Sequence, residues 1–191
     1  MTFGDGTHVI GSSLPAGTYR TRANVSGCYW ERLSGFSGQL SDIIANNFSN
    51  SHQVVAIAPT DAGFNSEGCG TWTNNLSALT TSQTAPFADG TFIVSTDISA
   101  GTWSAPGGSS CYWERLAGFS GQSSDIIAND FGATTPMVTI SASDIGFTSN
   151  DCGGVDEAVR LRAGALNLLS TRSRTVTDRA RTGSRLGRGR F

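Results

Sequence analysis

The chain has 191 residues and a formal net charge of −2, with only 15% charged residues and no lysine. No run of 18 apolar residues occurs, so the sequence predicts no membrane-spanning helix. The first residues carry neither a basic start nor an apolar run, so no leader is visible. The 24 glycines, and short runs of Val, Ile, Tyr, Phe and Trp broken by Gly, Ser, Asn and Asp, predict an all-β protein.

One stretch of 21 residues occurs twice and organises the chain. Residues 28–48 return as residues 111–131, with 18 of the 21 positions identical. A second cysteine follows each copy at the same distance, Cys69 in one case and Cys152 in the other. Self-similarity at this level predicts two small tandem modules.

The first module, residues 1–73, contains several short apolar runs separated by turn residues. Gly17 supplies the dihedral freedom for a tight turn that would join the first two long strands in a hairpin. Residues 60–64, Thr-Asp-Ala-Gly-Phe, are interpreted as a loop. We expect six antiparallel strands in a small sandwich or barrel, at residues 7–11, 18–22, 28–33, 41–46, 52–58 and 70–73.

The second module, residues 87–155, repeats these features, and its boundaries follow from where the repeat begins and ends. Residues 74–86 are polar, rich in Ser and Thr and end in Pro86, so we predict a linker that few contacts cross. The repeat stops after Gly153, because Val155 stands where the first module has Trp72.

The remaining residues, 156–191, differ from the modules in charge. They hold nine arginines and three carboxylates, 9 − 3 = +6, whereas residues 1–155 hold four arginines and twelve carboxylates, 4 − 12 = −8. We expect an irregular or partly helical tail that is disordered or not native to the protein. A basic arm for nucleic acid or anionic lipid is the alternative.

The four cysteines indicate one disulfide in each module. A zinc site would need two more ligands in each module, and both histidines lie in the first module. A bridge would close a loop of about 42 residues and stabilise its module by roughly 4 kcal/mol. Disulfides also favour an oxidising location outside the cytosol. We therefore predict the pairs Cys28–Cys69 and Cys111–Cys152.

Candidate catalytic groups are few, and we expect a protein that is not an enzyme and has no metal or cofactor. No Ser–His arrangement is repeated, because the second module has no histidine. Glu31 and Asp42 recur as Glu114 and Asp125 and are a candidate acid–base pair. The alternative is that Glu31 pairs with an arginine at position 20, 22 or 32, and that Asp42 caps a turn.

The repeated aromatic residues suggest a binding surface. Neighbours along a strand point to opposite faces, and Trp30 shares its face with the buried Cys28. Trp30 is therefore expected in the core and Tyr29 on the outer face beside Glu31. We predict that Tyr29 and Glu31, repeated as Tyr112 and Glu114, contact a ligand. The alternative is that the tyrosines pack under a loop or against the other module.

The string Cys-Tyr-Trp-Glu-Arg-Leu-Ser-Gly-Phe-Ser-Gly, with Gly-Asp-Gly-Thr before it and Gly-Cys-Gly-Thr-Trp after it, carries a resemblance. It resembles repeat modules of exported actinobacterial proteins and lipoproteins, most specifically at Cys-Tyr-Trp-x-Arg-Leu. The resemblance covers residues 3–72 and 87–153. It implies a β-rich module outside the cytoplasm and brings no catalytic residues.

These observations together predict an exported or cell-surface, non-enzymatic protein that binds a ligand or has a structural role. A glycan of the cell envelope or a surface protein is the partner expected, and nucleic acid is not. One alternative is an accessory region of an extracellular enzyme whose catalytic domain lies elsewhere. A second alternative is binding of nucleic acid or anionic membranes by the arginine-rich tail.

Overall fold

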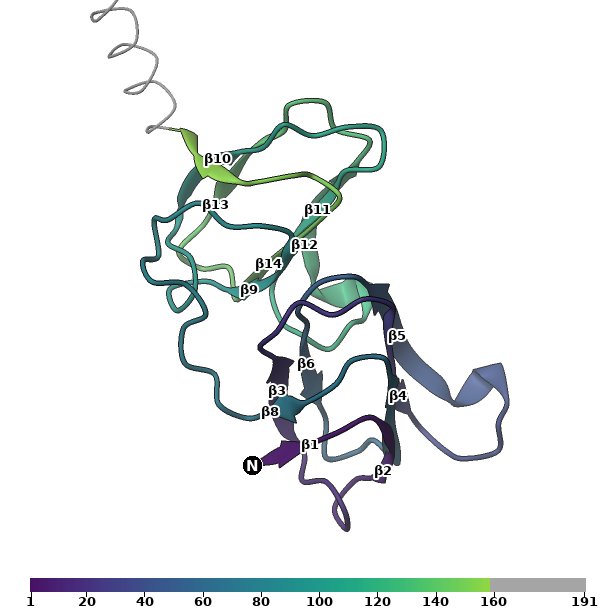
Figure 1. The fold of residues 1–191 in the computed structure, drawn as a ribbon. Helices are drawn as coiled ribbons and strands as arrows, with labels where there is room; N and C mark the ends of the chain where they lie inside the picture. Colours follow the sequence, from purple (N-terminus) through teal and green to yellow (C-terminus); the bar gives the residue numbers. More distant parts are fainter. Residues whose placement is uncertain (159–191) are drawn as a thin grey trace, which may run out of the picture. The chain divides into compact units, whose positions relative to one another are not determined.

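Each copy of the repeat forms two antiparallel sheets whose inner faces share a core (Figure 1). The computed structural model describes residues 1–158. Within this range, Met1–Glu157 form one compact unit that contains both copies. Over the same range no helix has the length and apolar character needed to cross a membrane.

The first module is a sandwich of two four-stranded sheets. One sheet has the strand order β1-β8-β3-β6 and the other the order β2-β7-β4-β5. A 3-10 turn at Leu40–Asp42 precedes β5. The strands are β1 Thr2–Phe3, β2 Gly6–Val9, β3 Gly17–Thr21, β4 Cys28–Leu33, β5 Ile43–Ser49, β6 Val54–Ile57, β7 Gly63–Glu67 and β8 Trp72–Thr73.

The second module repeats this arrangement. One sheet has the order β12-β11-β14-β9 and the other the order β13-β10-β15. A 3-10 turn at Ser123–Asp125 precedes β12. The strands are β9 Gly90–Ile93, β10 Gly101–Ser104, β11 Tyr112–Leu116, β12 Ile126–Phe131, β13 Met137–Ile140, β14 Gly146–Asn150 and β15 Asp156–Glu157. The all-β class and the tandem modules predicted from the sequence are confirmed.

Two details of the predicted strand arrangement are wrong. Strand β7 lies between β2 and β4, where the sequence indicated a loop; Phe64 is its only large apolar residue, so its composition looks like that of a turn. The expected hairpin does not form, because β2 pairs with β7 while β3 pairs with β6 and β8. The first two long strands therefore lie in opposite sheets.

The core of the first module is built from aromatic rings of both sheets. Trp72 and Tyr19 come from one sheet, and Trp30 and Phe64 come from the other. The rings of Phe64 and Trp72 meet edge to face with centroids 5.3 Å apart, a favoured aromatic geometry. Only 3% of Trp30 is exposed, which confirms its predicted place in the core.

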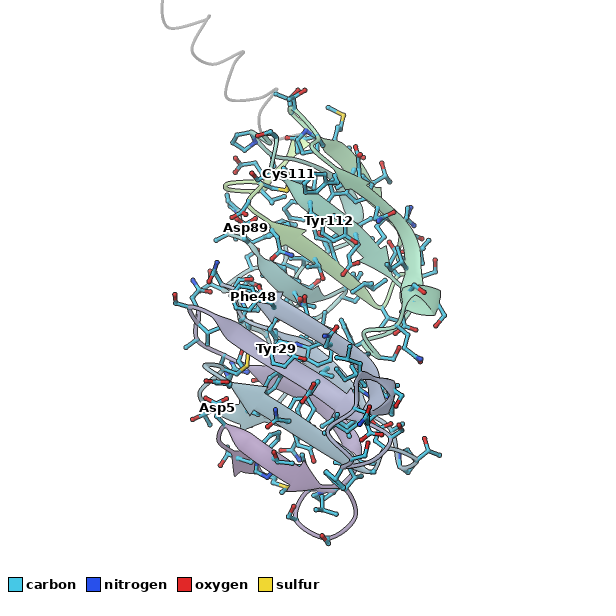
Figure 2. All side chains as sticks on the ribbon, turned by 90° about the vertical axis from the view of Figure 1, so that its right-hand side faces the viewer. Asp5, Tyr29, Phe48, Asp89, Cys111 and Tyr112 are labelled. Carbon is cyan, nitrogen blue, oxygen red and sulfur yellow. A yellow bond between two sulfur atoms is a disulfide. The ribbon has the colours of Figure 1, made fainter. Side chains whose placement is uncertain are left out.

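Both predicted disulfides are present. In each module an aspartate near the first strand fixes the backbone of the second cysteine. Asp5 Oδ1 accepts from the Cys69 amide at 3.1 Å, and Asp89 Oδ1 accepts from the Cys152 amide at 3.2 Å (Figure 2). Each bridge therefore ends at a hydrogen-bonded turn. The pairs are Cys28–Cys69 and Cys111–Cys152, each with Cα atoms 4.3 Å apart.

The second module continues past the predicted boundary at residue 155. Val155 exchanges backbone hydrogen bonds with Phe87 and is buried, and Asp156–Glu157 pairs with β10 as strand β15. These two residues were expected to begin the tail, because the sequence there no longer resembles the first module. The backbone pairing persists although the side chains differ. The rest of the predicted tail, residues 159–191, lies outside the described residues.

The predicted linker, residues 74–86, has no strand or helix but is bonded to both modules. Arg22 of the first module donates to the Ser77 carbonyl at 2.9 Å. The Asp97 carboxylate of the second module accepts from the Leu79 amide at 2.8 Å, and the Asp97 carbonyl accepts from the Thr80 hydroxyl. The expectation of few contacts was wrong, because arginine and aspartate side chains satisfy the carbonyls and amides of this segment.

Candidate functional site

The outer face of strand β4 carries a row of hydrogen-bonded polar side chains. Tyr29 donates its hydroxyl proton to Glu31 Oε2 at 2.8 Å and accepts from Asn46 Nδ2 at 3.2 Å. Asn65 donates to Glu31 Oε1 at 3.2 Å and accepts from the Thr7 hydroxyl at 2.9 Å. Four strands thus contribute one fixed row, which we call the first outer row.

The second module has the equivalent residues, with one change that matters. Tyr112 donates to Glu114 Oε2 at 2.7 Å and accepts from Asn129 Nδ2 at 3.3 Å. Thr148 replaces the asparagine and bonds to Thr91 at 3.2 Å instead of to the glutamate. Among residues 1–158, Glu114 Oε1 therefore has no hydrogen-bond partner. These five residues are the second outer row.

The two tyrosines differ in environment. Burial, and after it the hydrogen bond to Glu114, raise the pKa of Tyr112 to about 12. Burial also raises the pKa of Tyr29, which is less enclosed. Both phenols are therefore protonated at neutral pH and act as donors to the glutamates. Figure 2 shows the two residues on equivalent strands of the two modules.

The alternative ion pairs proposed for Glu31 do not form. Its two oxygens bind Tyr29 and Asn65, while Arg32 on the opposite face pairs with Asp61 at 2.7 Å. Asp42 accepts from the backbone and the hydroxyl of Ser37, as predicted for a turn cap. Glu31 is therefore a surface residue held by neutral partners.

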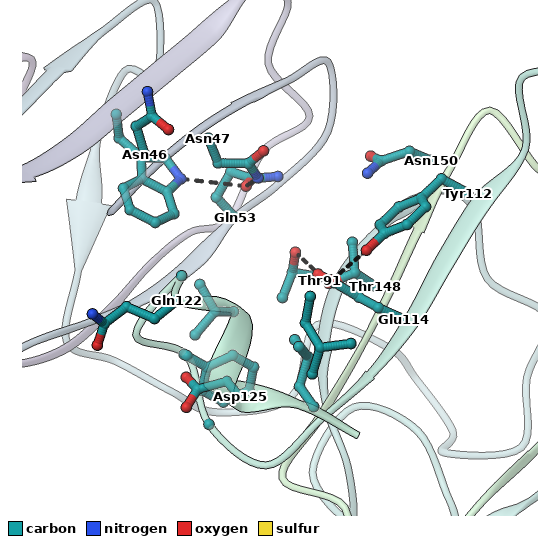
Figure 3. A pocket seen from close by; sticks show the side chains of 17 residues that line it. Asn46, Asn47, Gln53, Thr91, Tyr112, Glu114, Gln122, Asp125, Thr148 and Asn150 are labelled. Atoms are coloured by element: carbon teal, nitrogen blue, oxygen red, sulfur yellow. Dashed lines mark hydrogen bonds between the residues drawn. The ribbon is translucent and has the colours of Figure 1, made fainter. Parts of the chain in front are cut away.

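A pocket with a volume of about 190 Å³ lies between the second outer row and the first module. Asn46, Asn47 and Gln53 of the first module face Tyr112 and Asn150 of the second (Figure 3). Loop residues Gln122 and Asp125 line the pocket as well. Its lining contains two carboxylates, Glu114 and Asp125, and no arginine or histidine, which disfavours an anionic ligand.

Several hydrogen bonds join the two modules beside this pocket. The Ala56 amide donates to the Phe119 carbonyl at 2.7 Å, and the Thr91 amide donates to the His52 carbonyl at 3.1 Å. Arg32 Nη1 donates to the Ser120 carbonyl at 2.7 Å. We call this set of contacts between the modules the junction.

A fully buried ion pair also crosses the junction. Arg20 donates to both oxygens of Asp97, at 3.2 and 2.8 Å, and neither side chain is exposed. Beside it His52 is buried against Phe92, with ring centroids 4.7 Å apart. Burial, together with the charge of Arg20, lowers the pKa of His52 to about 4. His52 is therefore neutral at physiological pH.

The first outer row lies in an open hollow instead. Tyr29 and Glu31 line it together with loop residues 35–40, where 55% of Phe36 is exposed. The equivalent Phe119 is only 9% exposed because it packs against Val54 of the first module. The structure thus presents the same row once covered and once uncovered.

The sequence matches the family of Rv1352-like extracellular domains twice, over residues 1–73 and 84–154. The chain belongs to this family. Each Rv1352-like domain corresponds to one module, and the family places the chain outside the cell or at its surface. The resemblance to exported repeat modules is supported at this level, while the role of Cys-Tyr-Trp-x-Arg-Leu as the family's signature stays a prediction. No curated protein and no solved structure matches the chain.

Sequence reasoning placed Tyr112 and Glu114 on the outer face of an Rv1352-like domain but missed the groups that face them. Gln53 and Asn47 come from the other module, and only the fold brings them to the pocket. Gln122 follows the repeated Ser-Gly loop, and its counterpart Gln39 lies in the hollow of the first module. The repetition of this glutamine in the same loop of both modules was the sequence signal that could have identified Gln122 as a pocket residue.

Proposed function

We propose that the chain is a non-catalytic extracellular binding protein that takes a neutral, hydroxyl-rich ligand, a glycan of the cell envelope, in the pocket between its modules. The observation that carries the proposal is the unpartnered Glu114 Oε1. In the first outer row the equivalent oxygen is satisfied by Asn65. In the second row the amide is replaced by Thr148, which leaves a charged acceptor facing the pocket.

The rest of the lining supports a hydroxyl-rich ligand. A hydroxyl both donates and accepts, so it can donate to Glu114 and accept from an amide N–H such as that of Asn150 or Gln122. Asn150 Oδ1 already accepts from Ser49 at 3.3 Å, so its amide nitrogen is the group that remains. The Tyr112 ring adds an apolar surface on which a sugar ring can stack.

The pocket has room for several water molecules, because its volume of about 190 Å³ is many times the roughly 10–15 Å³ that one water needs. A sugar unit that displaces them replaces their hydrogen bonds with its own hydroxyls, which is the condition for a gain in affinity. Tyr29 and Glu31, the other two residues predicted to contact a ligand, line the separate open hollow, so the proposal assigns this ligand to Tyr112 and Glu114 and not to them.

A glycan array on the oxidised full chain, followed by calorimetry with the best neutral oligosaccharide, tests the proposal. Glu114→Gln removes the negative charge and should weaken binding about tenfold, because a hydrogen bond to a charged group contributes about 1.5–3 kcal/mol. Gln122→Ala should weaken it less.

The repeat supplies matched controls at the same positions of the other module. Glu31→Gln and Gln39→Ala should leave the affinity within about twofold of the unchanged protein. If no neutral glycan binds, or if each control has the same effect as its partner, the pocket is not the binding site. Selective capture of peptides on a parallel array would move the function to a different ligand class.

A further inference from the structure

The junction brings together one surface of each module. Because the modules are repeats, each of these two surfaces has a counterpart on the other module, and both counterparts are exposed. On the second module, Ile93 and Phe119 pack against Val54 and Ala56 of the first module. Their counterparts on the first module are Val9 and Phe36, which are 46% and 55% exposed. We call the surface around Val9, Phe36 and the first outer row the open face.

The surface of the first module that covers Phe119 also has an exposed counterpart, on the second module. Val54 is 4% exposed in the junction, whereas its counterpart Met137 on the second module is 65% exposed. Arg115, the counterpart of Arg32, keeps its aspartate partner, with Nε 2.6 Å from Asp144. Its side chain is 24% exposed, against 5% for Arg32. We call the surface around Met137, Thr139 and Arg115 the covering face.

We propose that a second copy of this chain docks its covering face onto the open face, repeating between molecules the junction found within one. The proposal commits to this occupant because the chain itself shows how such faces meet. This proposal is independent of the glycan function, because the open face and the covering face both lie outside the pocket between the modules.

The contacts that close the junction are mostly backbone contacts, so the repeat can reproduce them. Within one chain the Ala56 amide donates to the Phe119 carbonyl. The equivalent residues are Thr139 for Ala56 and Phe36 for Phe119, so between two copies the Thr139 amide would donate to the Phe36 carbonyl. Both amides lie on edge strands, β6 and β13, where backbone donors on the outer side have no partner in the sheet. A docked copy satisfies these donors.

The other contacts follow the same correspondence. Within one chain Arg32 donates to the loop carbonyl of Ser120. The equivalent donor and acceptor between two copies are Arg115 and the carbonyl of Ser37. Glycine at position 38 leaves that loop open to close approach, as Gly121 does over Trp30.

One part of the junction cannot be repeated between molecules. The buried Arg20–Asp97 pair has serines at both equivalent positions, Ser104 and Ser13. The docked pair also lacks the covalent connection that raises the effective concentration within one chain. The association is therefore weaker than the internal junction and depends on protein concentration.

Because the two faces differ, the contact is head-to-tail and does not close on itself after one step. Each added copy covers one first outer row and exposes another. Sedimentation velocity of the oxidised full chain should show dimers and then longer species as concentration rises. A chain that stays monomeric up to its solubility limit overturns the proposal.

A pair of single-face variants makes the test specific. Phe36→Asp blocks the open face and Met137→Asp blocks the covering face; each variant alone should lose association by at least about tenfold. Mixed in equal amounts, they should form a capped dimer and nothing longer, because each supplies the face that the other lacks. Far-ultraviolet circular dichroism checks that both variants keep the fold.

The repeat again provides controls. Phe48 and Phe131 occupy equivalent positions in the two modules and are 64% and 72% exposed. This position is therefore exposed both in the module whose outer row is covered and in the module whose outer row is not. Phe48→Asp and Phe131→Asp should leave the association of the full chain unchanged. Association that survives Met137→Asp, or that falls equally in the controls, overturns head-to-tail docking and indicates a different contact.

Discussion

The first and second modules share a nearly identical central strand and differ in what their indoles contact. Trp30 donates to Gln53 at 3.4 Å, and Trp72 donates to Ser66 at 3.1 Å. In the second module Pro136 and Val155 stand at the positions of Gln53 and Trp72. Among the described residues Trp113 Nε1 therefore has no partner, although it is buried.

The comparison teaches that identical strands do not make equally packed modules. A small apolar void lies beside Trp113 and Val155, where the first module holds the Trp72 ring. An unfilled volume and an unpaired donor both reduce stability. The second module also buries Phe119 against the first module, a contact that the exposed Phe36 of the first module does not make.

The largest effect should come from testing the two indoles directly. Trp30→Ala removes a buried ring and its hydrogen bond and should cost roughly 3–5 kcal/mol of unfolding free energy. Trp113→Ala should cost about 1–2 kcal/mol less, because its Nε1 is already unsatisfied and its packing is looser. Denaturant unfolding of the oxidised proteins measures both, and equal losses would refute the difference between the cores.

A second prediction concerns the junction and pH. The pKa of His52 is about 4 when folded and near 6.5 when unfolded, so the unfolded state binds more protons between these values. Stability is full above pH 6.5 and falls as the pH drops toward 4, by about 3 kcal/mol. Arg20 opposes protonation of His52, while Asp97 partly favours it.

The repeat suggests the variant that checks this origin. His52→Thr installs the residue found at the equivalent position 135 and should flatten the stability profile between pH 6.5 and 4. Asp144, whose pKa is lowered by Arg115, loses its contribution only as the pH falls below its usual range. A decline between pH 6.5 and 4 that persists in His52→Thr would assign the effect to another group.

The smallest expected effect separates the two outer rows. Tyr29→Ala removes a ring from an open hollow and should change stability by less than about 0.5 kcal/mol. Tyr112→Ala removes a ring from the pocket between the modules and should cost about 1–2 kcal/mol. Thermal unfolding at neutral pH is sufficient, and a larger loss from Tyr29→Ala would show that the open hollow is not open in solution.

The sequence predicted the features that depend on period and repetition. Alternation along β4 placed Trp30 inside and Tyr29 outside, and equal spacing paired the cysteines. It missed β7, because Phe64 is its only strong apolar signal. It also missed the junction, because Arg20 and Asp97 are 77 residues apart and neither is repeated in the other module, where serines stand at the equivalent positions 104 and 13.

Only one side of the candidate site was predicted from the sequence, the side formed by Tyr112 and Glu114. A strand pattern identifies outward residues such as Glu114, but it does not say which of the two rows another module covers. It also does not give the partners of Asn65 and Thr148, which lie on β7 and β14, because the neighbours of these strands across the sheet were not predicted. The unpartnered oxygen of Glu114 is a consequence of this single difference in side-chain length.

The position of the disulfides has a mechanical consequence for a protein outside a cell. Each bridge spans 41 residues, and a pull on the two ends of the chain cannot lengthen the part between bonded cysteines. At about 3.4 Å per extended residue, each bridge withholds roughly 140 Å of extension. Both modules therefore resist stretching over strands β4 to β7 and β11 to β14, which carry all residues of the outer rows except Thr7 and Thr91, while the reduced chain can extend fully.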